Sequence, residues 1–121
     1  MNILQHVLVD ILGMNSSGKE HVENELVDVL KIYSKDKKTA IELLEPSSNE
    51  STIEKYLNNK GPGIHHISLT VDSLENAIIY LKEKNVVLIY EKPKIGADKK
   101  LITFIHPQSS PGLLIELCQK T

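Results

Sequence analysis

A chain of 121 residues has room for one domain, or for two small modules that share a core. Apolar residues make up 40% and charged residues 25%, with a formal net charge of -2 at pH 7, which is ordinary for a globular protein. Because the chain has no basic excess, nucleic acid is not expected as a partner, and a small molecule is. Cys118 is the single cysteine, so an internal disulfide is excluded and a cytoplasmic location is expected.

The first twelve residues predict a helix. They lack the basic start of a signal peptide and reach Asp10 early, so we expect neither a signal peptide nor a membrane span. Apolar residues recur at helical spacing from Ile3 to Leu12, and Gly13 is placed to end the helix.

Residues 15–60 predict strands followed by one helix, and the segment 15–25 is polar enough to be mostly loop. The expected elements are a short edge strand around 19–22, a hairpin of strands 26–34 and 39–44 with a charged turn between them, and a helix over 52–59 that Ser51 or Asn49 can cap.

Residues 61–121 predict a βαβββ module. The expected elements are a strand ending at Val71, a helix over 74–84, and strands over 86–90, 101–105 and 112–118, with a polar loop over 91–100.

The strand that follows the glycine-rich turn at 61–63 alternates between a polar and an apolar side. The apolar residues within 67–71 point to one side, which we expect to cover a helix. His66 points to the polar side, where an imidazole can take part in chemistry, although an isolated histidine can also be structural. His65 lies on the apolar side and is the weaker candidate.

The tripeptide Ile-Glu-Leu occurs at 41–43 and again at 115–117, and the strands before each copy correspond at the same shift. This repeat predicts a duplicated βαβββ module. The counterpart of His66 would precede Met1, so we expect residues 1–60 to form a first module that lacks its opening strand. Residues 61–121 form the complete second module, and together the two make one α+β domain.

Glu42 and Glu116 occupy equivalent positions in the two copies of the repeat. A carboxylate within an otherwise apolar strand is costly to bury without a cation, so the pair suggests a shared metal ion. Both could instead face solvent on the open side of a sheet. If the two modules pair edge to edge, His66 joins them, and this ligand set suits Co²⁺, Mn²⁺, Ni²⁺ or Zn²⁺ with open positions.

Three segments of the second half, residues 63–68, 91–96 and 106–117, together with 41–46 in the first half, resemble the methylmalonyl-CoA epimerase family of the glyoxalase, or vicinal-oxygen-chelate, superfamily. The resemblance implies paired βαβββ modules, an acyl-CoA substrate and a divalent metal ion, with Co²⁺ expected first. It also implies interconversion of (R)- and (S)-methylmalonyl-CoA. An incomplete first sheet leaves an open strand edge, so we expect a homodimer.

Carried over residue by residue, the resemblance implies that His66, Glu116 and Glu42 bind the metal. It also implies that Glu116 and Asp28 transfer protons on opposite sides of the substrate. The family's first ligand is a histidine in the strand that the repeat predicts to be missing, and His6 does not replace it. A start codon assigned too late, a glyoxalase I-type lyase on the same scaffold, and a weakened or vestigial module remain as alternatives.

Overall fold

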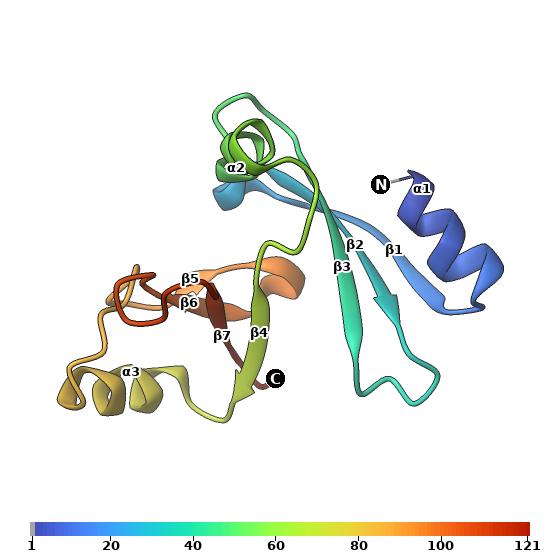
Figure 1. Cartoon of the computed structure of the whole chain (residues 1–121). Helices are drawn as coiled ribbons and strands as arrows, with labels where there is room; N and C mark the ends of the chain where they lie inside the picture. The colour runs from blue at the N-terminus through green and yellow to red at the C-terminus, as the bar shows by residue number, and fades with distance from the viewer. Residues whose placement is uncertain (1) are drawn as a thin grey trace. The chain divides into compact units, whose positions relative to one another are not determined.

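The computed structural model describes residues 2–121. The chain divides into two compact units, Met1–Pro62 and Gly63–Thr121 (Figure 1). The first unit contains a three-stranded sheet and the second a four-stranded sheet, each with helices. The predicted α+β class is confirmed.

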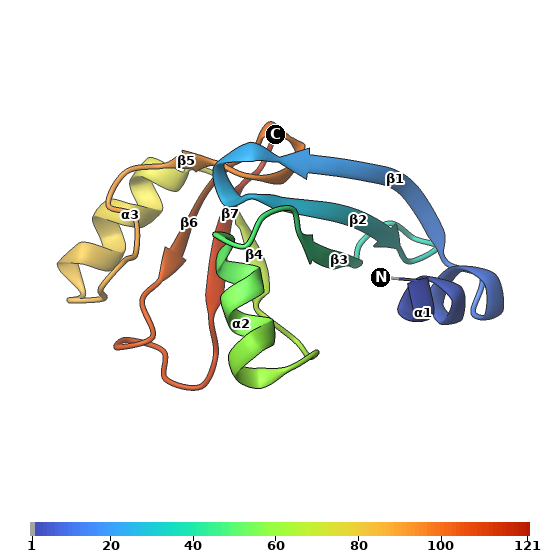
Figure 2. The ribbon, with the colours of Figure 1, turned by 90° about the horizontal axis from the view of Figure 1, so that it is seen from above.

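The first unit begins with a helix and continues with an antiparallel sheet in the order β1-β2-β3. Its elements are α1 (Asn2–Gln5), η1 (His6–Ile11), β1 (Asn15–Val22), η2 (Glu23–Glu25), β2 (Val27–Tyr33), β3 (Ala40–Pro46) and α2 (Thr52–Lys60). The predicted helices and the 26–34 and 39–44 strands are confirmed to within two residues. The helix formed by α1 and η1 runs along one side of this sheet (Figure 2).

Strand β1 is longer than the polar sequence at 15–22 predicts. It pairs with β2 over its whole length, with a shift in register between Ser16 and Lys19. An edge strand whose side chains mostly face solvent needs few apolar residues, because its main chain supplies the pairing. The expectation of a loop before residue 19 was therefore wrong.

One cluster of the core of the first unit lies between the sheet and the N-terminal helix. Leu30, Ile32 and Leu43 are buried on one face of β2 and β3. The residues that pack on this face from outside the sheet are Leu8, Val9 and Met14. Of the apolar residues within 3–12, Leu8 and Val9 thus cover this face of the sheet, whereas Ile3, Leu4, Ile11 and Leu12 are exposed.

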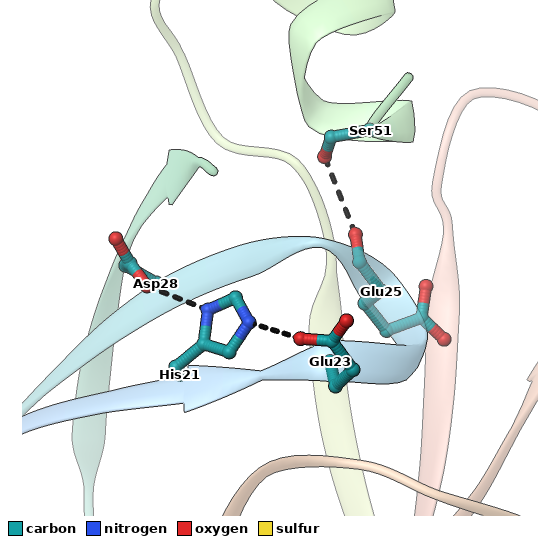
Figure 3. Close-up of polar contacts among 5 residues, drawn as sticks. All are labelled: His21, Glu23, Glu25, Asp28 and Ser51. Carbon is teal, nitrogen blue, oxygen red and sulfur yellow. Dashed lines mark hydrogen bonds and ion pairs between the residues drawn. The ribbon is translucent and has the colours of Figure 1, made fainter. Parts of the chain in front are cut away.

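Ser51 joins α2 to the turn between β1 and β2. Its side chain is 1% exposed, accepts a hydrogen bond from the Ile53 amide at 3.2 Å, and donates one to the Glu25 carbonyl at 3.3 Å (Figure 3). One hydroxyl thus caps the helix and satisfies a carbonyl of the turn, so its loss removes two buried hydrogen bonds at once.

We expect Ser51→Ala to lower the free energy of unfolding by about 2 kcal/mol, because the cap and the bond to the turn are both lost. Ser73→Ala is the matched control: Ser73 also caps a helix, accepting from the Asn76 amide at 3.2 Å in a more exposed setting. Its expected cost is about 1 kcal/mol. Urea denaturation of both variants measures the difference, and equal costs would contradict a role of Ser51 in joining the helix to the turn.

The second unit is a βαβββ arrangement with the sheet order β4-β7-β6-β5. Its elements are β4 (Ile67–Val71), α3 (Leu74–Glu83), β5 (Lys94–Ile95), η3 (Ala97–Lys99), β6 (Leu101–Ile105) and β7 (Ile115–Gln119). Strands β4 and β7 run parallel, and the other neighbours are antiparallel. The side chains of Leu74, Ile78, Leu88 and Leu117 form the buried core.

Several expectations for this unit were wrong: β5 lies within the predicted loop 91–100, and β7 begins at Ile115 and not at Gly112. The segment 86–90 is not a continuous strand but a single bridge between Leu88 and Ile105, because the Val87 amide donates to the Ser109 hydroxyl rather than to a strand. The apolar side of β4 was expected to be covered by a helix, but Ile67 and Leu69 are 40% and 50% exposed. Helix α3 packs instead on β6 and β7.

Within residues 2–121, no helix combines the length and the apolar character that crossing a bilayer requires.

Candidate active site

The parallel pairing of β4 with β7 brings His66 and Glu116 together. His66 immediately precedes β4, and Glu116 lies in β7 beside Ser68. The His66 Nε2 and Glu116 Oε1 atoms are 3.8 Å apart, and the two side chains are 17% and 15% exposed. This distance is too long for a hydrogen bond between the two atoms.

The spacing of His66 and Glu116 is compatible with two ligands of one metal ion. Nitrogen and oxygen ligands lie about 2.1 Å from a transition ion, so two ligands that share an ion are at most about 4.2 Å apart. The separation of 3.8 Å between His66 and Glu116 meets this condition. An imidazole and a carboxylate are also the donor types that such divalent ions accept, so the residues present fit the ion.

Neighbouring rings hold the His66 imidazole in place. The edge-to-face contact with Phe104 of β6 has a ring-centroid distance of 5.5 Å. On the His65 side, the two Nδ1 atoms are 2.8 Å apart. Burial is the main cause that lowers the pKa of His65, and the nearby His66 lowers it further, while the charge of Glu116 opposes both.

Glu42 lies in the first unit, on β3, directly opposite Lys31 of β2. Opposite charges at such cross-strand positions stabilise a sheet modestly, by about 0.2–1 kcal/mol. Among residues 2–121, no group of three or more His, Cys, Asp or Glu side chains is placed to hold a metal ion. The structure thus brings two of the three predicted ligands together, and the role of Glu42 stays a prediction.

The register of the first sheet separates Asp28 from Glu42. Asp28 pairs with Glu45 and Glu42 pairs with Lys31, so alternation along β2 places Asp28 and Glu42 on opposite faces. Asp28 shares its face with Leu30, which the N-terminal helix covers. Asp28 and Glu42 therefore face opposite sides of this sheet, and the role of Asp28 stays a prediction.

Glu20, which the sequence analysis did not single out, lies on the same face as Glu42. Glu20 of β1 pairs with Val29 of β2, and Val29 is two positions from Lys31, the partner of Glu42. Glu20 is half-buried. The register of β1 and β2 is set by the four-residue turn that follows Val22. A glycine would have marked this turn in the sequence, because glycine favours the left-handed conformation, but Leu26 adopts that conformation here, at φ 51°.

Asp28 belongs to a separate cluster around His21. The His21 Nδ1 atom is 2.9 Å from Asp28 Oδ1, and the Nε2 atom is 2.6 Å from Glu23 Oε2 (Figure 3). The hydrogen bond to Asp28 and then that to Glu23 raise the pKa of His21. Because each ring nitrogen faces its own carboxylate, the cluster favours a protonated imidazole and not a shared metal ion.

The raised pKa of His21 predicts a pH-dependent stability. A histidine whose pKa is higher in the folded state stabilises the fold fully below its ordinary pKa of 6.5, and this contribution is lost as the pH rises through the raised pKa. We therefore expect the melting temperature to fall as the pH rises above 6.5, and His21→Gln to remove this slope. His6→Gln controls for the loss of an exposed imidazole beside a carboxylate. An unchanged slope in His21→Gln would contradict the account.

Comparisons with known proteins add to this geometry. The family model of the Glyoxalase/Bleomycin resistance protein/Dioxygenase superfamily matches residues 3–104. The mitochondrial methylmalonyl-CoA epimerase of Dictyostelium discoideum is 47% identical over 83 residues, which are 68% of this chain and 50% of that protein. The chain thus spans about half the length of the curated epimerases that it matches first.

Two solved structures are similar over almost the whole chain. The crystal structure of methylmalonyl-CoA epimerase from Mycobacterium tuberculosis has a TM-score of 0.93 at 28% identity, and the match covers 99% of this chain and 80% of that one. A methylmalonyl-CoA epimerase in complex with methylmalonyl-CoA and NH4+ has a TM-score of 0.85 at 25% identity, with 99% and 85% covered.

Proposed function

The chain belongs to the glyoxalase/bleomycin resistance protein/dioxygenase superfamily, and from that premise we propose that it is a methylmalonyl-CoA epimerase. It would interconvert (R)- and (S)-methylmalonyl-CoA. The observation that carries this proposal is the His66–Glu116 pair, which is partly buried and spaced to share an ion. The likeness to epimerases, one of them solved with methylmalonyl-CoA, supports the substrate.

The reaction requires proton transfer on two sides of one carbon. C2 of methylmalonyl-CoA lies between a thioester and a carboxylate, so removing its proton leaves an enolate. Returning a proton to the opposite face inverts the centre. The enzyme therefore needs one group to take the proton and another, across the substrate, to give one back.

We propose that His66 and Glu116 hold a divalent ion, with Co²⁺ expected first and Mn²⁺, Ni²⁺ or Zn²⁺ as alternatives. When bound, such an ion supplies Lewis acidity that stabilises negative charge on the substrate oxygens. Glu42 is proposed as a further ligand on the strength of the sequence repeat alone.

We propose Glu116 as one of the two proton-transfer groups. Its side chain is 15% exposed, so a proton on it is shielded from bulk water. For the opposing transfer, the register favours Glu20 over Asp28, because Glu20 shares the face of Glu42 and Asp28 does not. Asp28 is also held by its hydrogen bond to His21.

Two further expectations belong to this proposal. A homodimer is supported by the edge position of β3 in its sheet, because edge strands offer unpaired main-chain groups to a second subunit. Light scattering would measure the molar mass. A cytoplasmic location is supported by the single Cys118, whereas the names of several relatives include the mitochondrion. Fractionation of cells that express the tagged chain distinguishes the two.

The proposed function is tested by comparing two substrates. The purified chain with added CoCl₂ is incubated with (S)-methylmalonyl-CoA and, separately, with the hemithioacetal of glutathione and methylglyoxal. Formation of (R)-methylmalonyl-CoA without turnover of the hemithioacetal supports the proposal. Turnover of the hemithioacetal alone indicates a glyoxalase I-type lyase. Inactivity toward both, together with failure to bind Co²⁺, indicates a vestigial module.

A further inference from the structure

His65 and His66 place their rings on the same side of the chain, although neighbours in a strand point to opposite sides. The reason is that β4 begins only at Ile67, so the two histidines precede the regular strand. Their rings are nearly perpendicular, at 88°, with centroids 5.0 Å apart, and both side chains are half-buried. The expectation that His65 lies on the side opposite His66 was therefore wrong.

The contact between the rings is a hydrogen bond that needs one proton. The two Nδ1 atoms are 2.8 Å apart, and a bond at this distance requires a proton on one nitrogen and a lone pair on the other. If His65 donates, the neutral His66 ring carries its proton on Nε2, where Glu116 is too distant at 3.8 Å to accept it. If His66 donates, its Nε2 lone pair faces the Glu116 carboxylate, an arrangement that a cation between the two atoms would stabilise.

We propose that His65 is a positioning residue that accepts a hydrogen bond from His66 Nδ1 and so keeps His66 Nε2 unprotonated toward Glu116. The inference rests on the proposed function, since an unprotonated Nε2 is what a metal ion requires of this ring. Ligand histidines usually donate their other ring N–H to a carboxylate, a carbonyl or water, and loss of that partner typically weakens metal binding about 10- to 100-fold. In this chain, a second imidazole takes that place.

Phe104 has the complementary role on the same ring. Its edge-to-face contact with His66, at an interplanar angle of 80°, packs the imidazole without offering it a hydrogen bond. Phe104 therefore limits rotation of the His66 ring, and His65 determines whether Nδ1 or Nε2 of His66 carries the proton. This division makes the effect of His65 separable from that of packing.

Two variants of His65 distinguish the effect of its hydrogen-bond acceptor from the effect of its side-chain volume. His65→Asn retains an oxygen that can accept near the position of Nδ1, and His65→Leu retains volume but accepts nothing. Long-range ¹⁵N–¹H NMR of the metal-free protein reports which nitrogen of His66 carries the proton. Absorption titration with CoCl₂ alone reports metal affinity without substrate.

We expect the Nδ1–H form of His66 in the wild type and in His65→Asn, and a mixture of the two forms in His65→Leu. Affinity for Co²⁺ should fall about 10- to 100-fold in His65→Leu and recover to within a few-fold of the wild type in His65→Asn. A proton on Nε2 of His66 in the wild type would overturn the inference without any variant. So would a folded His65→Leu variant with unchanged tautomer and cobalt affinity.

The same measurements separate this inference from the proposed function. A wild type that shows the Nδ1–H form but neither binds Co²⁺ nor epimerises methylmalonyl-CoA supports the hydrogen bond and overturns the epimerase. A wild type that epimerises and binds Co²⁺ but carries its His66 proton on Nε2 overturns the inference alone.

Discussion

Glu116→Gln is expected to lower kcat for epimerisation of methylmalonyl-CoA by about 10²- to 10⁴-fold, the range that a general acid or base contributes. Glutamine keeps the size of the side chain and one acceptor oxygen, but it cannot take up the C2 proton. Because the side chain is partly buried beside His66, a water molecule is a poor substitute for the lost carboxylate. Steady-state kinetics with (S)-methylmalonyl-CoA measure the effect.

Glu91→Gln is the matched control for this prediction. Glu91 is a carboxylate of the same unit, but it is 76% exposed and lies 3.8 Å from Lys82. Exposed pairs of this kind contribute about 0–1 kcal/mol, so the variant should fold and turn over like the wild type. If Glu116→Gln retained kcat within about threefold of the control, general acid-base chemistry at Glu116 would be contradicted.

Glu20→Gln is expected to lower kcat by about 10²-fold or more, whereas Asp28→Asn should leave kcat nearly unchanged. The two residues lie on adjacent strands of one sheet but on opposite faces, and only Glu20 shares the face of Glu42. Asp28→Asn instead weakens the bond to His21, so its effect should be a lower melting temperature near pH 6. Parallel kinetics and thermal unfolding of the two variants measure both effects.

The opposite pattern would restore Asp28 to the site. A large fall in kcat for Asp28→Asn, with normal kcat for Glu20→Gln, would mean that the face covered by the N-terminal helix is the one that meets substrate. His21→Gln serves here as the control, because it removes the partner of Asp28 and leaves the carboxylate in place.

Periodicity in the sequence was enough to predict most elements, whereas the pairing of His66 with Glu116 was predicted from the repeat and the family resemblance. The alternation within 67–71 and the helical spacing within 74–84 are strong local signals, and both elements formed as expected. His66 and Glu116 meet because β4 and β7, which are neighbours in the sheet although α3, β5 and β6 separate them in the chain, pair in parallel.

Register and turn geometry could not be predicted in the same way. The face on which Asp28 lies depends on a hairpin turn that contains left-handed Leu26, a residue that gives no turn signal. Similarly, the contact between His65 and His66 depends on β4 starting at Ile67 and not one residue earlier. A shift of one residue in strand register moves each side chain to the other face of the sheet, and amino-acid composition does not reveal such a shift.

Exchange of the C2 proton of methylmalonyl-CoA in D₂O tests the central claim most directly. Proton NMR follows the exchange with wild-type protein stripped by a chelator, with the same protein after addition of CoCl₂, and with His66→Ala under both conditions. We predict rapid exchange only in the cobalt-treated wild type. Exchange at the same rate in the stripped protein or in cobalt-treated His66→Ala would contradict a metal site built on His66 and Glu116.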